Sequence, residues 1–349
     1  MLCASTLVAV FALISALNVA VADAHSPPSS LESTMASLPG ATDQATGVSC
    51  MPDGPCIAID YSGQVYVLSG NHVALIGDIG IATFGVSCPT LTYCVLVSED
   101  AAVVLHASQA RGYPLEYGNG SDTHWQSISC SSPSFCMAGG GLIGGPEDGA
   151  GVVASWNGYT WSPVRVILPD IPSEFKTTIS SMSCTGPTFC VAADQDQRVT
   201  QWNGKRWTEP SALNEGIDSI ATACLSARFC LAVGSDSHSA WDWNGRSWQL
   251  TRISDLSTPF LAPFVGCLSS SDCVAVTPMG SGQRWNGSNW GKAQQLYADH
   301  MDDIQGFSCS SAGFCEAVTG GDHFIYVHDA HQAPRLPVLC SLGCKSAVT

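Results

Sequence analysis

The sequence predicts an all-β protein, a seven-bladed β-propeller of four-stranded antiparallel blades with one disulfide in each blade. Three observations support this fold. Pairs of cysteines with the spacing C-x5-C occur seven times, and their first cysteines lie 38 to 54 residues apart. The block W-N-G-x-x-W occurs four times between them. The composition agrees, because 34 glycines and 19 prolines in 349 residues favour turns over long helices.

The N-terminal segment predicts export. Residues 4 to 22 are almost wholly apolar, carry no charge and lead into small-residue sites of the A-x-A type. This pattern is typical of a secretory signal peptide over residues 1–24, cut before Asp23 or His25. The alternative is an uncleaved N-terminal membrane anchor. No other segment is apolar enough to span a bilayer, so we expect a secreted, extracellular protein that leaves the membrane after signal removal.

The cysteines predict a disulfide framework. Of 17 cysteines, Cys3 leaves with the signal peptide and 16 remain, an even number that suits an exported, oxidised chain. Zinc sites use shorter spacings with two converging knuckles, so the regular C-x5-C spacing disfavours metal binding. The predicted bridges are Cys50–Cys56, Cys88–Cys94, Cys130–Cys136, Cys184–Cys190, Cys224–Cys230, Cys267–Cys273, Cys309–Cys315 and, in a C-terminal tail over residues 331–349, Cys340–Cys344.

Each repeat is expected to form four strands. The first ends at the first cysteine, the second begins at the second cysteine, the third runs into the tight Asn-Gly turn, and the fourth carries the second tryptophan. Residues directly opposite in an antiparallel hairpin have Cα atoms ~4.5 Å apart, a distance that a disulfide accepts.

The second strand of each repeat is apolar on both faces. In the fourth repeat, Phe189 and Val191 lie on one face, and Cys190 and Ala192 lie on the other. A strand buried on both sides needs a neighbouring sheet on each side, as in a propeller. We therefore expect the propeller over residues 48–330, and residues 25–47 could supply a strand that closes the ring. An open stack of repeats is the alternative.

Tandem units of Φ-S-C-x5-C-Φ-A-V (Φ, an apolar residue) followed by W-N-G-x-x-W resemble secreted bacterial β-propellers with paired cysteines, of the type common in actinobacteria. The resemblance covers residues 48 to about 330 and implies the fold and export, but no single activity. The turn distantly resembles the Asp-box of sialidase-like propellers. Residues 158–161 and 245–248 match the second half of that motif, but Trp156 and Trp243 stand where it has its Asp.

The order of strands predicts which face of the ring could bind a ligand. In an up-and-down blade the connections 1–2 and 3–4 share one face, here called the disulfide face, and the others share the opposite, loop-rich face. The two longest segments between strands, residues 139–151 and 165–178, both fall on the loop-rich face, and long loops often carry function. The disulfide face, with short uniform turns, is expected to leave little room for a pocket.

Acidic residues cluster in the connections of the loop-rich face. They would suit a cation or a polyhydroxylated ligand; the alternative is a solvated acidic surface that keeps the protein soluble. Ca²⁺ is the one cofactor for which we consider a site, at Asp194 and Asp196. The ligand-binding candidates are Asp60, Asp100, Glu147, Asp148, Asp194, Asp196, Asp236 and Asp322, with Glu99 beside Asp100.

The function classes can be narrowed. A net charge of −16 argues against a protein that tracks nucleic-acid phosphates. The enzyme signatures G-x-S-x-G and H-E-x-x-H do not occur. The best acid–base cluster is Asp299, His300, Asp302 and Asp303. The paired tryptophans are interpreted as packing, although exposed rings could stack on sugars.

We therefore expect an extracellular binding protein that recognises glycans or cell-envelope polymers through its loop-rich face. The alternatives are a glycan-cleaving enzyme, a hydrolase or lyase, that uses carboxylates on the same face, and a platform for an extracellular protein partner. N-x-S/T sequons stand at Asn119 and Asn286.

Overall fold

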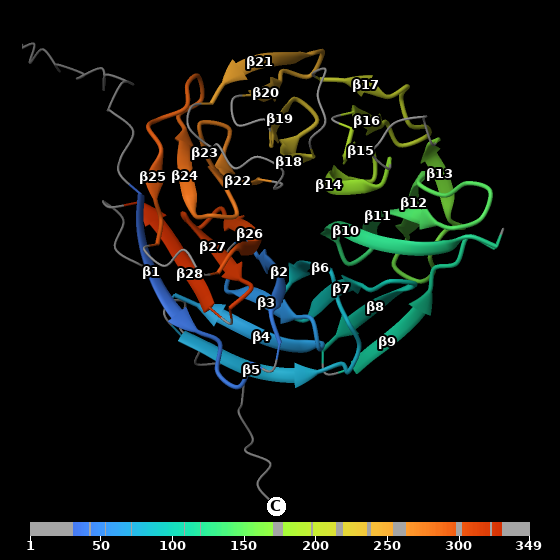
Figure 1. Cartoon of the computed structure of the whole chain (residues 1–349), viewed down its shortest axis with the longest axis horizontal. Helices are drawn as coiled ribbons and strands as arrows, with labels where there is room; N and C mark the ends of the chain where they lie inside the picture. Colours follow the sequence, from blue (N-terminus) through green and yellow to red (C-terminus); the bar gives the residue numbers. More distant parts are fainter. Residues whose placement is uncertain are drawn as a thin grey trace, which may run out of the picture.

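The computed structural model describes residues 31–329, apart from residues 42, 53, 71, 108, 119, 170–176, 197, 214–218, 236–238, 254–262, 298–301 and 322. Within these residues the chain forms 28 strands and no helix. The strands make seven antiparallel sheets of four, which surround a common axis (Figure 1). The predicted all-β, seven-bladed propeller is confirmed, and none of the described segments is a helix long and apolar enough to cross a membrane.

In six blades four consecutive strands run from the axis to the rim, and in the last blade the outermost strand comes from the N-terminal segment. The blades are numbered 1 to 7 in the chain order of their innermost strands. The innermost strands are β2 (Ala45–Cys50), β6 (Gly85–Thr90), β10 (Asp122–Ser132), β14 (Ile179–Gly186), β18 (Ile220–Ser226), β22 (Phe264–Ser269) and β26 (Ile304–Ser310). The second strands are β3 (Cys56–Asp60), β7 (Tyr93–Val97), β11 (Phe135–Ile143), β15 (Phe189–Asp194), β19 (Phe229–Gly234), β23 (Asp272–Val276) and β27 (Phe314–Thr319).

The outer half of each blade varies more in length. The third strands are β4 (Gln64–Ser69), β8 (Ala101–His106), β12 (Gly151–Trp156), β16 (Arg198–Trp202), β20 (Ser239–Trp243), β24 (Ser281–Trp285) and β28 (His323–Asp329). The outermost strands are β5 (His72–Asp78), β9 (Gln109–Pro114), β13 (Arg165–Leu168), β17 (Ser211–Ala212), β21 (Trp248–Arg252), β25 (Gln294–Gln295) and, for blade 7, β1 (Leu31–Ser37).

The ring closes in blade 7. Strand β1, from the N-terminal segment, pairs antiparallel with β28 over its whole length, from Leu31 opposite Asp329 to Ser37 opposite His323. The first and last described strands of the chain therefore share one sheet. Opening the ring would break this ladder of backbone hydrogen bonds.

A disulfide joins the two inner strands of every blade. All seven C-x5-C bridges predicted within the described residues are present, with Cα–Cα distances of 3.9 to 4.1 Å. In blades 1 and 4, for example, the bonded cysteines stand directly opposite each other in the hairpin. The predicted Cys340–Cys344 bridge and the signal segment lie outside the described residues.

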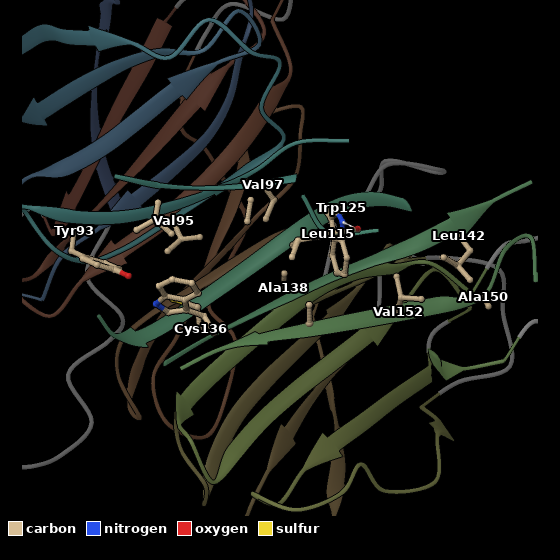
Figure 2. Close-up of a cluster of buried hydrophobic side chains, with 14 residues drawn as sticks. Tyr93, Val95, Val97, Leu115, Trp125, Cys136, Ala138, Leu142, Ala150 and Val152 are labelled. Atoms are coloured by element: carbon tan, nitrogen blue, oxygen red, sulfur yellow. Dashed lines mark hydrogen bonds between the residues drawn. The ribbon is translucent and has the colours of Figure 1, made fainter. Parts of the chain in front are cut away.

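The core lies in the seams between blades. In the seam of blades 2 and 3, Val95 and Val97 of β7 share one apolar cluster with Trp125 and Ala138 (Figure 2). The prediction of two-sided burial is confirmed in blade 4, where Cys190 and Ala192 pack toward blade 3 while Phe189, Val191 and Ala193 pack toward blade 5.

The W-N-G-x-x-W block forms a turn that is fastened to the disulfide hairpin. The asparagine Oδ1 accepts hydrogen bonds from two backbone amides, as in Asn203 with Lys205 and Arg206, and the following glycine has a φ of +88° to +95°. The first tryptophan's indole N–H donates, at 2.9 to 3.2 Å, to a carbonyl in the disulfide loop, namely that of Pro133, Pro187, Ala227 or Ser270. The interpretation of the tryptophans as packing agrees with this geometry.

The second tryptophan differs from its expected place. It begins the outer strand only in blade 5, at Trp248. In the other three blades it forms an isolated bridge with the first tryptophan, before the outer strand starts. Pro163 and Pro210 follow shortly after it in blades 3 and 4, and proline cannot donate to a strand ladder.

The serine before the first cysteine links neighbouring blades. Its Oγ accepts a hydrogen bond, at 2.9 to 3.0 Å, from the amide of the first cysteine in the next blade. The pairs are Ser49 with Cys88, Ser87 with Cys130, Ser129 with Cys184, Ser183 with Cys224 and Ser308 with Cys50. Blades 5 and 6 have Ala223 and Gly266 at this position, so the seams between blades 5, 6 and 7 lack the bond.

Candidate functional site

The loop-rich face carries a pocket of about 560 Å³ at the seam of blades 2 and 3. It is formed by the connection from β7 to β8, the connection from β9 to β10, and the end of β11. Its lining residues are Glu99, Asp100, Glu116, Gly118, Gly120, Ser121, Asp122, Thr123, His124 and Ile143. We call it the acidic pocket.

Backbone contacts hold the walls of the acidic pocket while the carboxylates stay exposed. The carbonyl of Glu99 accepts from the Trp125 amide at 3.3 Å, and that of Asp100 accepts from the Leu115 amide at 2.8 Å. The indole of Trp125 is fully buried and donates to the Leu115 carbonyl, as does the Thr123 hydroxyl. The loops are thereby tied to the core of the seam.

The four carboxylates of the pocket have no cationic partner among the described residues. Glu99, Asp100, Glu116 and Asp122 are all exposed, and no described Lys or Arg lines the pocket with them. Four carboxylates along one pocket give it a negative potential. Carboxylate oxygens accept hydrogen bonds and pair with cationic side chains, so hydroxyl groups and basic side chains are the partners that suit this lining.

A row of three aromatic rings leads to the pocket. Tyr61 contacts Phe84 edge-on at 5.7 Å between ring centroids, and Phe84 contacts His124 at 4.9 Å. These residues come from the connections of blades 1 and 2 and from the start of β10. The sequence does not indicate this row of rings, because no motif joins three single residues from three separate segments.

The glycine-rich segment 139–151 is more ordered than the predicted loop. Strand β11 continues through the glycines to Ile143, and Leu142 and Ala150 are buried in the core. A Cβ on Gly140 would lie 2.2 Å from the His124 carbonyl oxygen, so glycine permits the close approach of β10. Only residues 144–150 form a loop. Ile143, the last residue of β11, lines the pocket.

Glu147 and Asp148 lie in this loop. A hydrogen bond with Glu147 raises the pKa of the Tyr117 hydroxyl, and Asp148 accepts from the Gly144 amide at 2.8 Å. The two long segments meet at Thr177, whose hydroxyl donates to the Gly149 carbonyl at 2.7 Å.

Asp60 and Asp194 serve the turns in which they stand. Both are fully buried, and each accepts a hydrogen bond from the backbone amide four residues later, at Gln64 and Arg198. Asp194 also pairs with the Arg198 guanidinium at 2.7 Å, although burial still raises the pKa of this carboxyl. The Asp196 amide donates to the same carboxylate at 3.0 Å.

The same capping position recurs around the ring, four residues after the second cysteine. Side chains there accept a hydrogen bond from an amide at the start of the third strand. The acceptors are Asp60, Ser98, Asp194, Thr277 and Thr319. This pattern is visible in the sequence and separates capping acids from exposed ones such as Asp100.

Of the remaining acidic and histidine candidates, only Asp302 and Asp303 lie within the described residues. Asp236, Asp322, Asp299 and His300 lie outside the described residues. Asp302 holds its carboxylate 3.3 Å from Nδ1 of His323, and the Asp303 carbonyl accepts from the Gly320 amide. No group of three or more His, Cys, Asp or Glu side chains in the described part of the chain is arranged to hold a metal ion.

The disulfide face is not as flat as predicted. A hollow of about 450 Å³ lies where the seven inner strands end, and all seven first cysteines line it. Short hairpins form the face, but strands that converge on the axis leave a central opening. Interblade serine bonds occupy much of its wall.

Comparisons with known proteins bear on the fold. No known family model matches the chain, and no curated protein sequence matches it. Solved structures do resemble it. Virginiamycin B lyase from Staphylococcus aureus has a TM-score of 0.67 at 8% identity, over 86% of this chain and 99% of that one. A streptogramin B lyase gives 0.66 at 10% identity, over 86% and 98%. YCF48 bound to D1 peptide gives 0.60 at 9% identity, over 84% and 96%. At these identities the likeness shows the propeller fold alone.

Proposed function

We propose that this propeller is an extracellular binding protein that recognises glycans or other cell-envelope polymers through the acidic pocket of its loop-rich face. The single observation that carries the proposal is a set of four carboxylates, exposed and without a cationic partner among the described residues, in one pocket beside a row of aromatic rings. The seven disulfides favour an oxidising compartment, in keeping with the predicted export.

The chemistry of the pocket suits a polyhydroxylated ligand. Each carboxylate offers acceptor oxygens to hydroxyl groups. The rings of Tyr61 and Phe84 offer apolar faces, and His124 belongs to both the ring row and the pocket lining. A sugar chain presents hydroxyl edges and apolar ring faces together, so both features would be used at once.

A second candidate is a protein partner with a basic segment. The uncompensated negative charge of the pocket favours it, since Lys and Arg side chains would pair with Glu99, Asp100, Glu116 and Asp122. One structural neighbour, YCF48, was solved with a D1 peptide. In this reading the loop-rich face is a platform for an extracellular protein.

A glycan array probed with the full mature chain, with and without Ca²⁺, tests the first proposal, and a library of basic peptides tests the second. The affinity of each ligand found is then measured by calorimetry for the parent and for the pocket variant Glu99→Gln/Asp122→Asn. The control is Glu32→Gln/Asp43→Asn, which removes the same charge elsewhere. We expect the pocket variant to lose at least tenfold in affinity and the control to lose little.

The outcomes separate the candidates. Glycan binding without release of sugar supports the binding protein, while released sugar would favour a glycan-cleaving enzyme. Basic peptides bound in place of glycans would favour the protein platform. Equal affinities for the pocket variant and its control would show that the acidic pocket is not the site.

A further inference from the structure

A groove lies on the outer wall of the ring, away from the acidic pocket and from the hollow of the disulfide face. It runs along the seam of blades 3 and 4, between β13 and the turn after β16, and has a volume of about 570 Å³. Its lining residues are Arg165, Val166, Ile167, Pro169, Arg198, Trp202, Lys205, Arg206, Trp207, Thr208, Glu209 and Pro210. We call it the wall groove.

The wall groove gathers positive charge in an acidic protein. Four of the chain's 13 Lys and Arg residues line it, and Glu209 is the one carboxylate among its described lining residues. Arg165, Lys205 and Arg206 are exposed and make no ion pair with a described residue. Arg198 is held in place by Asp194 at 2.7 Å.

An aromatic pair stands between these cations. The rings of Trp202 and Trp207 lie 5.8 Å apart at an interplanar angle of 48°. Both are half-buried, because they pack against the apolar cluster of the seam. The Trp202 indole N–H is fixed on the Pro187 carbonyl at 2.9 Å. The rings are therefore rigid and keep part of their surface in the groove.

The charges are not needed to form the turn. The two residues before the second tryptophan are Lys205 and Arg206 in blade 4, but the other blades use Tyr159 and Thr160, Arg246 and Ser247, and Ser288 and Asn289. All four turns have the same Asn-centred hydrogen bonds. Two adjacent cations at this position thus have no role in the turn itself.

We propose that the wall groove binds an acidic polysaccharide, a chain whose sugars carry carboxylate or sulfate groups. Guanidinium groups pair with such anions through paired, planar hydrogen bonds, and indole rings offer an apolar surface for the sugar rings. The proposal is independent of the function assigned to the acidic pocket. With a net charge of −16, the rest of the surface repels the same chain, which confines binding to this wall.

The experiment measures binding of oligogalacturonate to the full mature chain by calorimetry and tryptophan fluorescence at low salt. The fully methyl-esterified oligomer is the matched ligand control, since it keeps the sugars and removes the charge. Dextran sulfate distinguishes sulfate from carboxylate recognition. The groove variant is Arg165→Ala/Lys205→Ala/Arg206→Ala. The protein control, Arg228→Ala/Arg246→Ala/Arg252→Ala, removes three exposed cations from blade 5.

We expect the parent to bind one or both charged polymers and the esterified oligomer at least tenfold more weakly. The groove variant should lose at least tenfold in affinity, and the control less than threefold, with unchanged melting temperatures for both. No binding of either charged polymer by the parent, equal losses in both variants, or equal binding of the esterified oligomer would overturn the proposal.

Discussion

Blades 3 to 6, here called the tryptophan blades, carry the W-N-G-x-x-W turn, and blades 1, 2 and 7 do not. The two groups differ in the length of the outermost strand. The outer strands β1, β5 and β9 have seven, seven and six residues. In the tryptophan blades, β13, β17, β21 and β25 have only four, two, five and two. In blades 3, 4 and 6 an isolated tryptophan bridge, fastened to the disulfide hairpin, therefore stands where blades 1, 2 and 7 continue the backbone ladder. Blade 5 has both the tryptophan pair and a ladder of five pairs.

The wall groove lies between two tryptophan blades, and the acidic pocket lies between a blade without the tryptophan turn and one that has it. The wall groove runs beside β17, one of the shortest outer strands, where a longer strand would cover more of the seam. The acidic pocket instead lies on the loop-rich face, between blade 2, whose outer strand is long, and blade 3. The wall groove thus lies beside an outer strand that forms only two ladder pairs, whereas the acidic pocket adjoins a blade with a ladder of six pairs.

The largest effect is expected from deleting residues 25–37. This removes β1 and its seven paired positions along β28, and at about 1 kcal/mol per backbone hydrogen bond the loss in unfolding free energy should reach ~5 kcal/mol. Urea unfolding followed by circular dichroism measures it. As a control in a tryptophan blade, Ser211→Gly/Ala212→Gly should cost ~1 kcal/mol or less per residue. Similar losses in both would contradict the comparison.

The next largest loss of unfolding free energy is expected from replacing the first tryptophan of the W-N-G-x-x-W turn. Trp285 is 3% exposed and stands opposite Cys273, just as Leu68 stands opposite Cys56 in blade 1. Trp285→Ala should lower the unfolding free energy by ~3 to 5 kcal/mol and Leu68→Ala by ~2 to 5 kcal/mol. Trp285→Phe keeps an aromatic ring but loses the hydrogen bond to Ser270, so it should cost ~1 kcal/mol plus some packing. If Trp285→Ala costs less than Leu68→Ala, the fastening role is wrong.

A buried carboxyl makes blade 7 sensitive to pH. Glu316 is fully buried, neither of its oxygens has a hydrogen-bond partner among the described residues, and burial raises its pKa well above 4.5. The unfolded chain releases this proton at lower pH than the folded one, so stability should fall as pH rises above 4.5 toward the folded pKa.

The variant Glu316→Gln should remove this slope and be more stable than the parent at pH 8, by ~1 to 3 kcal/mol. Blades 1 to 6 have Ile57, Val95, Met137, Val191, Leu231 and Val274 at this place, so Glu316→Val should show the same gain. Urea midpoints measured from pH 4 to pH 9 test it. Parallel curves for the parent and both variants would contradict the prediction.

The smallest effect concerns the interblade serine bonds. Ser183→Ala removes the bond to the Cys224 amide, at a cost of ~1 kcal/mol. The reverse change Ala223→Ser offers the Cys267 amide a partner that the seam of blades 5 and 6 lacks, and should gain a similar amount. Chemical denaturation in triplicate resolves such differences, and a loss of stability with Ala223→Ser would show that this seam is spaced differently.

Much of the fold was predictable because its determinants are local and repeated. Cys184 and Cys190 lie in one hairpin. The hydrogen bonds on the Asn203 side chain are made within residues 202–207, and only the Trp202 indole reaches outside them, to the Pro187 carbonyl. Seven such units in one chain indicate seven blades. The lengths of the outer strands were less predictable. Trp161 and Trp207 pair only as isolated bridges, because the prolines that follow them interrupt the strand.

The candidate site was predictable only in part. Strand order placed it on the loop-rich face, and Asp100 was among the expected residues. Glu116, Asp122 and His124 were not, because they meet Asp100 only when β7, β9 and β10 converge at one seam. Asp60 and Asp194 resemble Asp100 in sequence, yet they are buried caps, and only their exact distance from the preceding cysteine distinguishes them.

The amino-acid sequence by itself thus determined the repeat, the disulfide pairs, the turns and the number of blades, since each depends on residues a few positions apart. The tertiary structure alone decided which side chains from different blades share a pocket. It also decided which charges are paired and which seams stay open. Those properties arise from packing between repeats that lie about 40 residues apart in the chain. A local sequence pattern does not specify how far apart side chains of different repeats lie in space.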